Sequence, residues 1–325
     1  MVKAEYSADN THACMLCPHH CKISPGKSGI CGVRKNKDNV IITDNFNKIS
    51  SLAFDPVEKK PLYHYYPGSR ILSAGTFGCN LKCPYCQNWQ ISQSVSGNYR
   101  EMSSEDLIET ALGNDVNLLA YTYSEPIVWY EYVKQTSISA IKAGIKNVMI
   151  TNGMINPDPL KEISSYIDAW NIDLKTSDRK VFSKVHKGHL DTVMHTISYL
   201  SGKAHVEITA LIVTGINDNL NDFTGIVDFI ASIDKRIPLH VTRYFPAYNY
   251  SAPATDPEIM HRFYDIANTK LDYVYCGNLL ENRFSDTFCP ACGELLIKRN
   301  NYDVKVKSLK DGSCSVCGNE IYGKF

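Results

Sequence analysis

The chain has 325 residues, of which 44% are hydrophobic and 21% charged, an ordinary composition for a globular protein. Lys plus Arg and Asp plus Glu both number 34, so no net field attracts nucleic acid or acidic membranes. No run of residues approaches the ~18 apolar positions that a membrane helix needs. The first residues, MVKAEYSADNTHAC, lack the basic and apolar parts of a secretory signal. We therefore expect a cytoplasmic protein that does not bind a membrane, and nucleic acid is disfavoured as a partner.

The twelve cysteines form three groups and one single residue. In a cytoplasmic chain such grouping indicates metal ligation rather than disulfide bonds. The first group has the spacing C-x2-C-x3-C-x9-C and consists of Cys14, Cys17, Cys21 and Cys31. It fits either a closed zinc site, which we favour because zinc suits small irregular loops, or an auxiliary iron–sulfur cluster that relays electrons. We predict a Cys-rich metal-binding segment over residues 1–66.

Residues 67–285 alternate short apolar runs with longer helical patterns, which is typical of βα units around a parallel sheet. A complete eightfold barrel needs roughly 250 residues, whereas about 210 lie between Pro67 and Asn278. We therefore predict an α/β fold with a partial (β/α)6 TIM-like barrel. The predicted strands are 71–75, 118–123, 147–152, 169–174, 205–213, 238–245 and a less regular 272–276.

Start signals mark two of the intervening helices. Ser104, followed by two acidic residues, is the expected N-cap of one helix, and Asp256, followed by Pro257, is that of another.

A second cysteine group follows the first predicted barrel strand, in the stretch GCNLKCPYCQNW. Parallel barrels keep their active sites at the carboxyl ends of the strands, so this position favours chemistry. Thiolates of Cys79, Cys83 and Cys86, spaced C-x3-C-x2-C, can hold three corners of a cubane iron–sulfur cluster and leave one iron open. A zinc site completed by a distant residue is the simpler alternative.

This spacing, with an aromatic residue before the last cysteine, resembles the radical S-adenosylmethionine superfamily. YTYSEP (121–126), TNG (151–153) and DLK (173–175) are similar to segments of its glycyl-radical activating enzymes. Over nearly the whole chain, including DPVEKKPLYHYYPGSR and CSVCGNEIYG, the sequence resembles more closely the radical enzyme of the AmmeMemoRadiSam system, which is similar to the activating enzyme of pyruvate formate-lyase. The resemblance implies a 4Fe-4S cluster whose open iron binds S-adenosylmethionine.

The resemblance also implies contacts to the cofactor. In YTYSEP, Tyr123 and Ser124 replace the glycines of the superfamily's Gly-Gly-Glu-Pro motif, while Glu125 remains to bind the methionine ammonium. Tyr85 is expected to stack on adenine, unless it only fills the loop.

Further strand-end residues are expected near the barrel mouth, where they would contact cofactor or substrate. Each also has a structural alternative: helix capping, solvation, a turn or a core ion pair. These candidates are Thr151, Asn152, Asp173, Lys175, Gly215 and Arg243.

The third cysteine group consists of two C-x2-C pairs separated by 21 residues with a hairpin pattern, which is typical of a zinc ribbon. We predict a zinc-ribbon-like module over residues 286–325, bound through Cys289, Cys292, Cys314 and Cys317, with zinc preferred over a single iron. Cys276, in an apolar run, is expected to be a small buried side chain.

Together these features predict an oxygen-sensitive enzyme that cleaves S-adenosylmethionine to a 5′-deoxyadenosyl radical and abstracts hydrogen from a protein or small-molecule substrate. An electron donor such as ferredoxin or flavodoxin is expected, and the resembled family implies Memo-like and AMMECR1-like partners. One alternative is an activase acting on a protein glycine. Another is a non-catalytic zinc scaffold, which predicts zinc in all three cysteine groups.

Overall fold

The computed structural model describes residues 2–8, 12–94, 98–279 and 281–325. Its centre is an eight-stranded sheet built from β7 (Ser51–Pro56), β8 (Arg70–Gly75), β10 (Leu118–Tyr121), β11 (Lys146–Thr151), β12 (Ala169–Asp173), β13 (His205–Ile212), β14 (Leu239–Arg243) and β15 (Val274–Gly277). The order across the sheet is β15-β14-β13-β12-β11-β10-β8-β7. From β8 to β15 every neighbouring pair is parallel, and β7 joins the outer edge antiparallel to β8.

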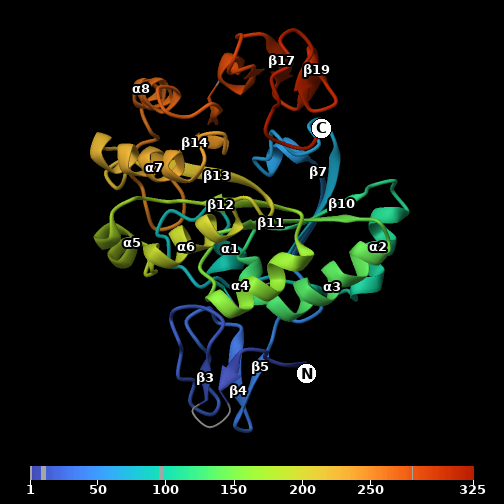
Figure 1. Cartoon of the computed structure of the whole chain (residues 1–325). Helices are drawn as coiled ribbons and strands as arrows, with labels where there is room; N and C mark the ends of the chain where they lie inside the picture. The colour runs from blue at the N-terminus through green and yellow to red at the C-terminus, as the bar shows by residue number, and fades with distance from the viewer. Residues whose placement is uncertain (1, 9–11, 95–97, 280) are drawn as a thin grey trace.

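Helices connect successive strands and cover the sheet (Figure 1). The α-helices are α1 (Trp89–Ser92), α2 (Ser104–Leu112), α3 (Tyr130–Lys142), α4 (Pro157–Ile163), α5 (Arg179–Val185), α6 (Leu190–Leu200), α7 (Leu220–Ile233) and α8 (Pro257–Asn268). Short 3-10 turns are η2 (Val57–Lys59), η3 (Pro126–Trp129), η4 (Ser164–Tyr166) and η5 (Asn282–Ser285).

This architecture confirms the predicted partial barrel and refines it in detail. The weakly predicted seventh parallel strand is present as β15, and β7 lies in a segment that the sequence assigns to the Cys-rich region. The strand after α2 ends at Tyr121 instead of residue 123, because Tyr123 has a positive φ of 70° that turns the chain out of the strand.

Local capping explains where helices begin. Asp256 caps α8 through its side chain and is followed by Pro257, as expected. The expected cap at Ser104 is wrong by one residue: Ser103 is the N-cap of α2, in a reciprocal capping box with Asp106.

The two Cys-rich ends of the chain lie on opposite sides of the central sheet (Figure 1). The N-terminal segment contains β1 (Val2–Lys3), β2 (Ser7–Ala8), β3 (Ala13–Cys14), β4 (Arg34–Lys37), β5 (Val40–Thr43) and β6 (Lys48–Ile49), the last paired with β9 (Arg100–Glu101). The C-terminal module contains β16 (Thr287–Phe288), β17 (Leu295–Asn300), β18 (Asp303–Val306), β19 (Leu309–Lys310) and β20 (Ser313–Cys314).

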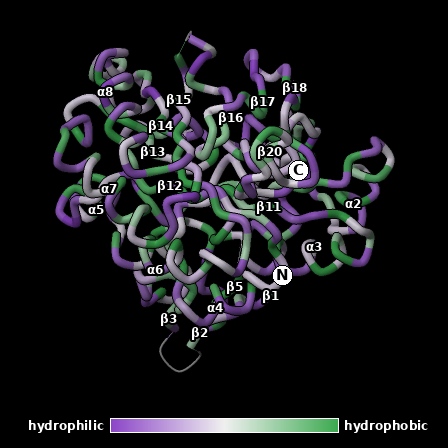
Figure 2. Tube along the Cα trace, turned by 45° about the horizontal axis from the view of Figure 1, so that its top comes forward, coloured by the Kyte–Doolittle hydropathy of each residue, from purple (hydrophilic) through white to green (hydrophobic). Residues whose placement is uncertain are grey.

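One large hydrophobic core runs from the barrel into the N-terminal segment, since Cys14 and Leu16 belong to the same buried cluster as Leu81 and Cys83. Hydrophilic residues make up much of the outer trace, including the loops around α5 and β17 (Figure 2). Within the described ranges, no helix has both the length and the apolar character that crossing a membrane requires.

Candidate active site

The three-cysteine loop lies at the carboxyl edge of the sheet, between β8 and α1. Cys79, Cys83 and Cys86 line one cavity of about 180 Å³. The Cys79 sulfur accepts a hydrogen bond from the Leu81 amide (3.3 Å), and the Cys86 sulfur contacts the Ser92 hydroxyl (3.1 Å). The loop therefore presents three thiols to a common space, as its spacing predicts.

Glu125 lies in the same cavity, at the N-terminus of η3. Its carboxylate accepts hydrogen bonds from the Thr151 hydroxyl (2.6 Å), the Asn152 amide (2.9 Å) and the Ile127 amide (2.9 Å). Burial raises the pKa of Glu125 to about 7, although these donors oppose the shift. The capping and binding interpretations are thus compatible: one oxygen caps η3, and the buried carboxylate remains a strong site for a cationic group.

Asp173 and Lys175, at the end of β12, border the thiols. The Lys175 ammonium donates to the Asp173 carboxylate at 2.8 Å. Burial alone would lower the pKa of Lys175, but Asp173, Cys83 and Tyr85 raise it well above its ordinary value. Lys175 is therefore a partly buried cation beside the thiols rather than a solvated lysine.

Tyr85 is buried, and its hydroxyl hydrogen bonds to His186 Nε2 at 2.7 Å. Its ring meets those of Tyr244 and Tyr250 edge-on. Tyr85 fills the loop and also lines the cavity, and its stacking on adenine stays a prediction.

A second cavity of about 330 Å³ shares Glu125, Asn152 and Asp173 with the first. Asn88, which donates to the Tyr123 carbonyl at 2.7 Å, also lines both cavities, and the second cavity adds Lys60, whose buried ammonium donates to Asp55 at 2.7 Å. Sequence reasoning did not single out these two residues. The only sequence signal for Lys60 is the stretch DPVEKKP, whose function cannot be read from local spacing.

Gly215 and Arg243, two of the predicted contacts, do not line either of these cavities. Arg243 turns toward the Thr255 carbonyl (2.7 Å) and stacks over the Phe245 ring. The Tyr250 hydroxyl lies near Gly215 and donates to the Thr214 carbonyl (2.7 Å). This hydrogen bond ties the loop after β13 to the segment that carries Tyr250.

The C-terminal cysteines form a compact set. Cys289, Cys292, Cys314 and Cys317 place their sulfurs within 4.8 Å of one another. This convergence is what a single tetrahedral ion requires, because Zn–S bonds of about 2.3 Å bring four sulfurs close together. The N-terminal cysteines line a separate small cavity of their own.

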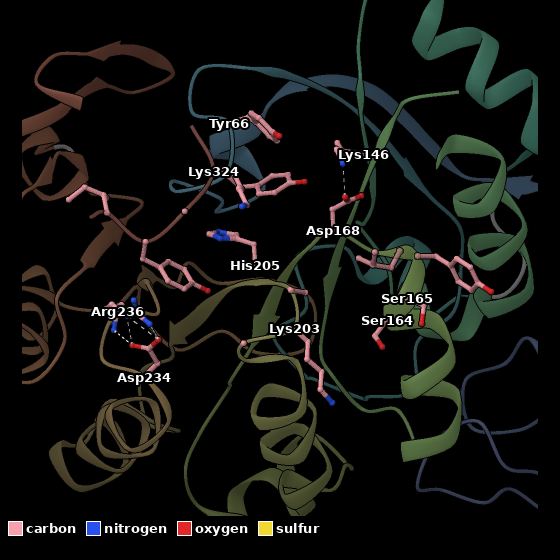
Figure 3. Close-up of a pocket in the computed structure, with 18 of the residues that line it drawn as sticks. Tyr66, Lys146, Ser164, Ser165, Asp168, Lys203, His205, Asp234, Arg236 and Lys324 are labelled. Carbon is pink, nitrogen blue, oxygen red and sulfur yellow. Dashed lines mark hydrogen bonds and ion pairs between the residues drawn. The ribbon is translucent and has the colours of Figure 1, made fainter. Parts of the chain in front are cut away.

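The largest described cavity, about 680 Å³, lies at the opposite, amino edge of the sheet (Figure 3). Its charged residues are largely paired with one another: Lys146 binds Asp168 and Arg236 binds Asp234. It contains no cysteine, and parallel barrels keep their chemistry at the other edge, so its size does not make it the active site.

The carboxyl-edge cavities fit a polar, cationic cofactor bound to a thiolate-held cluster. They have the scale of a small-molecule site and combine three thiols, a buried carboxylate and the buried Ser124 hydroxyl, which has no hydrogen-bond partner in the described structure. An unpartnered buried hydroxyl is costly, so a ligand that bonds it is favoured.

Comparison with known proteins agrees with this geometry. Residues 74–230 match the family model of the radical SAM superfamily. An uncharacterized protein of Methanocaldococcus jannaschii is 39% identical over 322 residues, which is 96% of each chain. A GTP 3′,8-cyclase of Alkaliphilus oremlandii is 24% identical over 67% of this chain and 74% of its own. Among solved structures, SuiB of Streptococcus suis bound to S-adenosylmethionine has a TM-score of 0.52 and 16% identity, covering 69% of this chain and 53% of SuiB, a likeness of fold alone.

Proposed function

The chain belongs to the radical SAM superfamily, and from this premise we propose that it binds a 4Fe-4S cluster and S-adenosylmethionine and abstracts hydrogen from a substrate at the barrel mouth. One observation carries the proposal: three thiols, the Glu125 carboxylate and the unpartnered Ser124 hydroxyl line adjoining cavities at the carboxyl edge of the sheet.

Cys79, Cys83 and Cys86 would hold the cluster, and Glu125 with Ser124 would hold the amino group of the methionine moiety. Held by these thiolates, a cluster would supply the one-electron reduction that radical S-adenosylmethionine chemistry requires. The chain's own residues position the cofactor and exclude water. Burial of Glu125 strengthens its attraction for an ammonium group, and Thr151 and the Asn152 amide fix the carboxylate's orientation.

Lys175 and Asp173 form a partly buried ion pair beside the thiols. The ammonium lies close enough to Cys83 for the two to interact electrostatically, so it would offset the negative charge of a thiolate-bound cluster. Lys60 and Asn88 line the cavity of about 330 Å³ and would contact the substrate or the nucleoside part of the cofactor.

The family membership favours an enzyme over the non-catalytic zinc scaffold. A protein substrate, as in glycyl-radical activases, and a small-molecule substrate both remain proposals, as do a ferredoxin or flavodoxin donor and Memo-like and AMMECR1-like partners. We further propose that the convergent C-terminal cysteines bind zinc, which would stabilise a small module with little core of its own.

The test uses anaerobically reconstituted protein with dithionite and S-adenosylmethionine, assayed for 5′-deoxyadenosine. The intact chain should form the product, and Cys83→Ala should abolish it while the zinc content stays unchanged. Cys276→Ala is the matched control, since Cys276 is also buried but lies in β15 outside the three cysteine groups. Product from Cys83→Ala at the rate of the intact chain would overturn the proposal.

A further inference from the structure

The N-terminal cysteines surround a closed space. Cys14, Cys17 and Cys31 are buried and Cys21 is partly buried. All four line one cavity of about 10 Å³, whose other walls include Ile30, Ile127 and Val128. The segment is tied together by backbone hydrogen bonds, such as Cys14 N to Cys21 O (2.9 Å), so the thiols are held in place by folded chain.

Their geometry differs from that of the C-terminal set. There, the sulfurs approach to 3.6 Å (Cys289 to Cys317) and 3.7 Å (Cys292 to Cys314), as a single tetrahedral ion requires. No set of three metal-binding groups converges to within 4.8 Å among the described N-terminal residues. A water-sized sphere fits in the cavity that these thiols line, whereas four sulfurs that all lie about 2.3 Å from a common centre leave no such space between them. The arrangement is therefore too wide for one zinc ion and suits a cluster of several metal ions.

Arg34 lines the same cavity and is 2% exposed. Its Nη1 donates to Glu131 Oε1 at 2.6 Å, but Nε and Nη2 have no hydrogen-bond partner in the described part of the chain. Unmade hydrogen bonds of a buried guanidinium are costly. An anionic thiolate-bound cluster, with sulfur acceptors on its surface, would accept hydrogen bonds from these two nitrogens and would be partly neutralised by the guanidinium charge.

This site packs directly against the three-cysteine loop. Gly78, which precedes Cys79, has a φ of 90°, and a Cβ there would lie 2.8 Å from the Cys31 carbonyl oxygen and 2.7 Å from Val33 Cγ1. His19 Nε2 hydrogen bonds to the Asn80 carbonyl at 2.7 Å. The backbone of one cysteine group thus touches the backbone of the other.

We propose that Cys14, Cys17, Cys21 and Cys31 hold a second cubane iron–sulfur cluster, which passes electrons to the cluster site at Cys79, Cys83 and Cys86. The electron acceptor, a cluster at the three-cysteine loop, rests on the proposed function. The identity of the metal at the N-terminal cysteines does not. A donor of the ferredoxin or flavodoxin class loses one electron to the N-terminal cluster. That cluster returns to its oxidised state when it reduces the second one, and no bond is made or broken at either thiolate set.

The decisive experiment measures metal in a triple variant, Cys79→Ala, Cys83→Ala and Cys86→Ala, reconstituted anaerobically with iron and sulfide. The inference expects about four irons and four sulfides per chain, with an EPR signal after reduction by dithionite. Adding Cys17→Ala should remove both iron and signal. A folded triple variant that retains zinc at the N-terminal site and no iron would overturn the inference.

The intact chain provides a second measurement should the triple variant not fold. About eight irons per chain would support two clusters, and about four irons with two zincs would overturn the inference. The two proposals fail separately. Two clusters without 5′-deoxyadenosine would contradict only the proposed function, whereas 5′-deoxyadenosine from a chain with one cluster would contradict only this inference.

Discussion

At the scale of single residues, Glu125 combines a binding position with an unusual environment. Its carboxylate is buried, accepts three hydrogen bonds and has a pKa raised by burial to about 7. Such a group is poorly stabilised without a cation. A ligand ammonium would therefore stabilise the carboxylate. The hydrogen bonds from Thr151, Asn152 and Ile127 fix its orientation for that contact.

Glu125→Gln should weaken binding of S-adenosylmethionine by about 10- to 100-fold, because a hydrogen bond to a charged group contributes about 1.5–3 kcal/mol. Equilibrium dialysis of reconstituted protein measures the affinity. Glu105→Gln, an exposed position in α2, is the control and should leave affinity unchanged. Equal affinities of Glu125→Gln and the intact chain would contradict the assigned role.

His64 provides a prediction about pH. It is fully buried, with Nδ1 against the Tyr322 carbonyl (2.6 Å) and Nε2 against the Tyr275 hydroxyl (2.5 Å), so the neutral ring donates to the first and accepts from the second. Burial lowers its pKa from 6.5 to about 3. The unfolded chain therefore takes up the proton first, and stability is complete above pH 6.5 and declines as the pH falls toward 3.

The free energy of unfolding of the anaerobic protein should decrease between pH 7.5 and pH 5, by up to ~1.4 kcal/mol per pH unit from this one group. The unfolding temperature should fall with it. His64→Gln should unfold at a lower temperature at pH 7.5 but show a flatter dependence. His195→Gln, at an exposed position in α6, should keep the dependence of the intact chain. An unchanged slope in His64→Gln would show that another group causes it.

At the scale of elements, the contact between the N-terminal segment and the three-cysteine loop depends on Gly78. Gly78→Ala should destabilise the protein by roughly 2–4 kcal/mol, because the added methyl group combines positive-φ strain with a clash against the Cys31 carbonyl. Thermal unfolding measures the loss. Gly144→Ala is a matched control with a φ of 77° and no atom within 4 Å of the new Cβ, so its cost should be limited to about 1 kcal/mol. Equal losses in both variants would mean that the clash is relieved without cost.

The sequence predicted those elements whose signals are local. The three-cysteine spacing and the strand ends that carry Glu125, Thr151 and Asp173 follow from periodicity, and the structure brings them to one edge of the sheet. Gly215 and Arg243 also follow strands, but side-chain direction after a strand depends on loop path, and Arg243 turns to Thr255. Lys60 reaches the site only through long-range packing of the segment after β7, which no local pattern encodes.

At the scale of the whole molecule, the two terminal cysteine sites have different neighbours. The N-terminal site contacts the three-cysteine loop, whereas the C-terminal module shares a hydrophobic cluster with Tyr273 and Tyr275 at the other side of the sheet. Damage to the C-terminal cysteine site should therefore leave the chemistry proposed for the three-cysteine loop intact.

Cys314→Ala should remove about one zinc per chain and lower the unfolding temperature, while the folded fraction still forms 5′-deoxyadenosine. Zinc analysis, thermal unfolding and product assay on the same preparation measure all three. Loss of product at normal stability would instead connect the module to catalysis. Cys276→Ala again controls for removal of a buried thiol.

The unequal exposure of the two terminal cysteine sets predicts different rates of metal uptake and exchange. Cys292 and Cys317 are exposed, whereas Cys14, Cys17 and Cys31 are buried beneath folded chain. A chelator or a metal donor can reach the C-terminal cysteines directly, so an ion bound there should exchange quickly. At the N-terminal set only Cys21 is partly exposed, so metal should enter and leave more slowly, and reconstitution should fill this set after the C-terminal one.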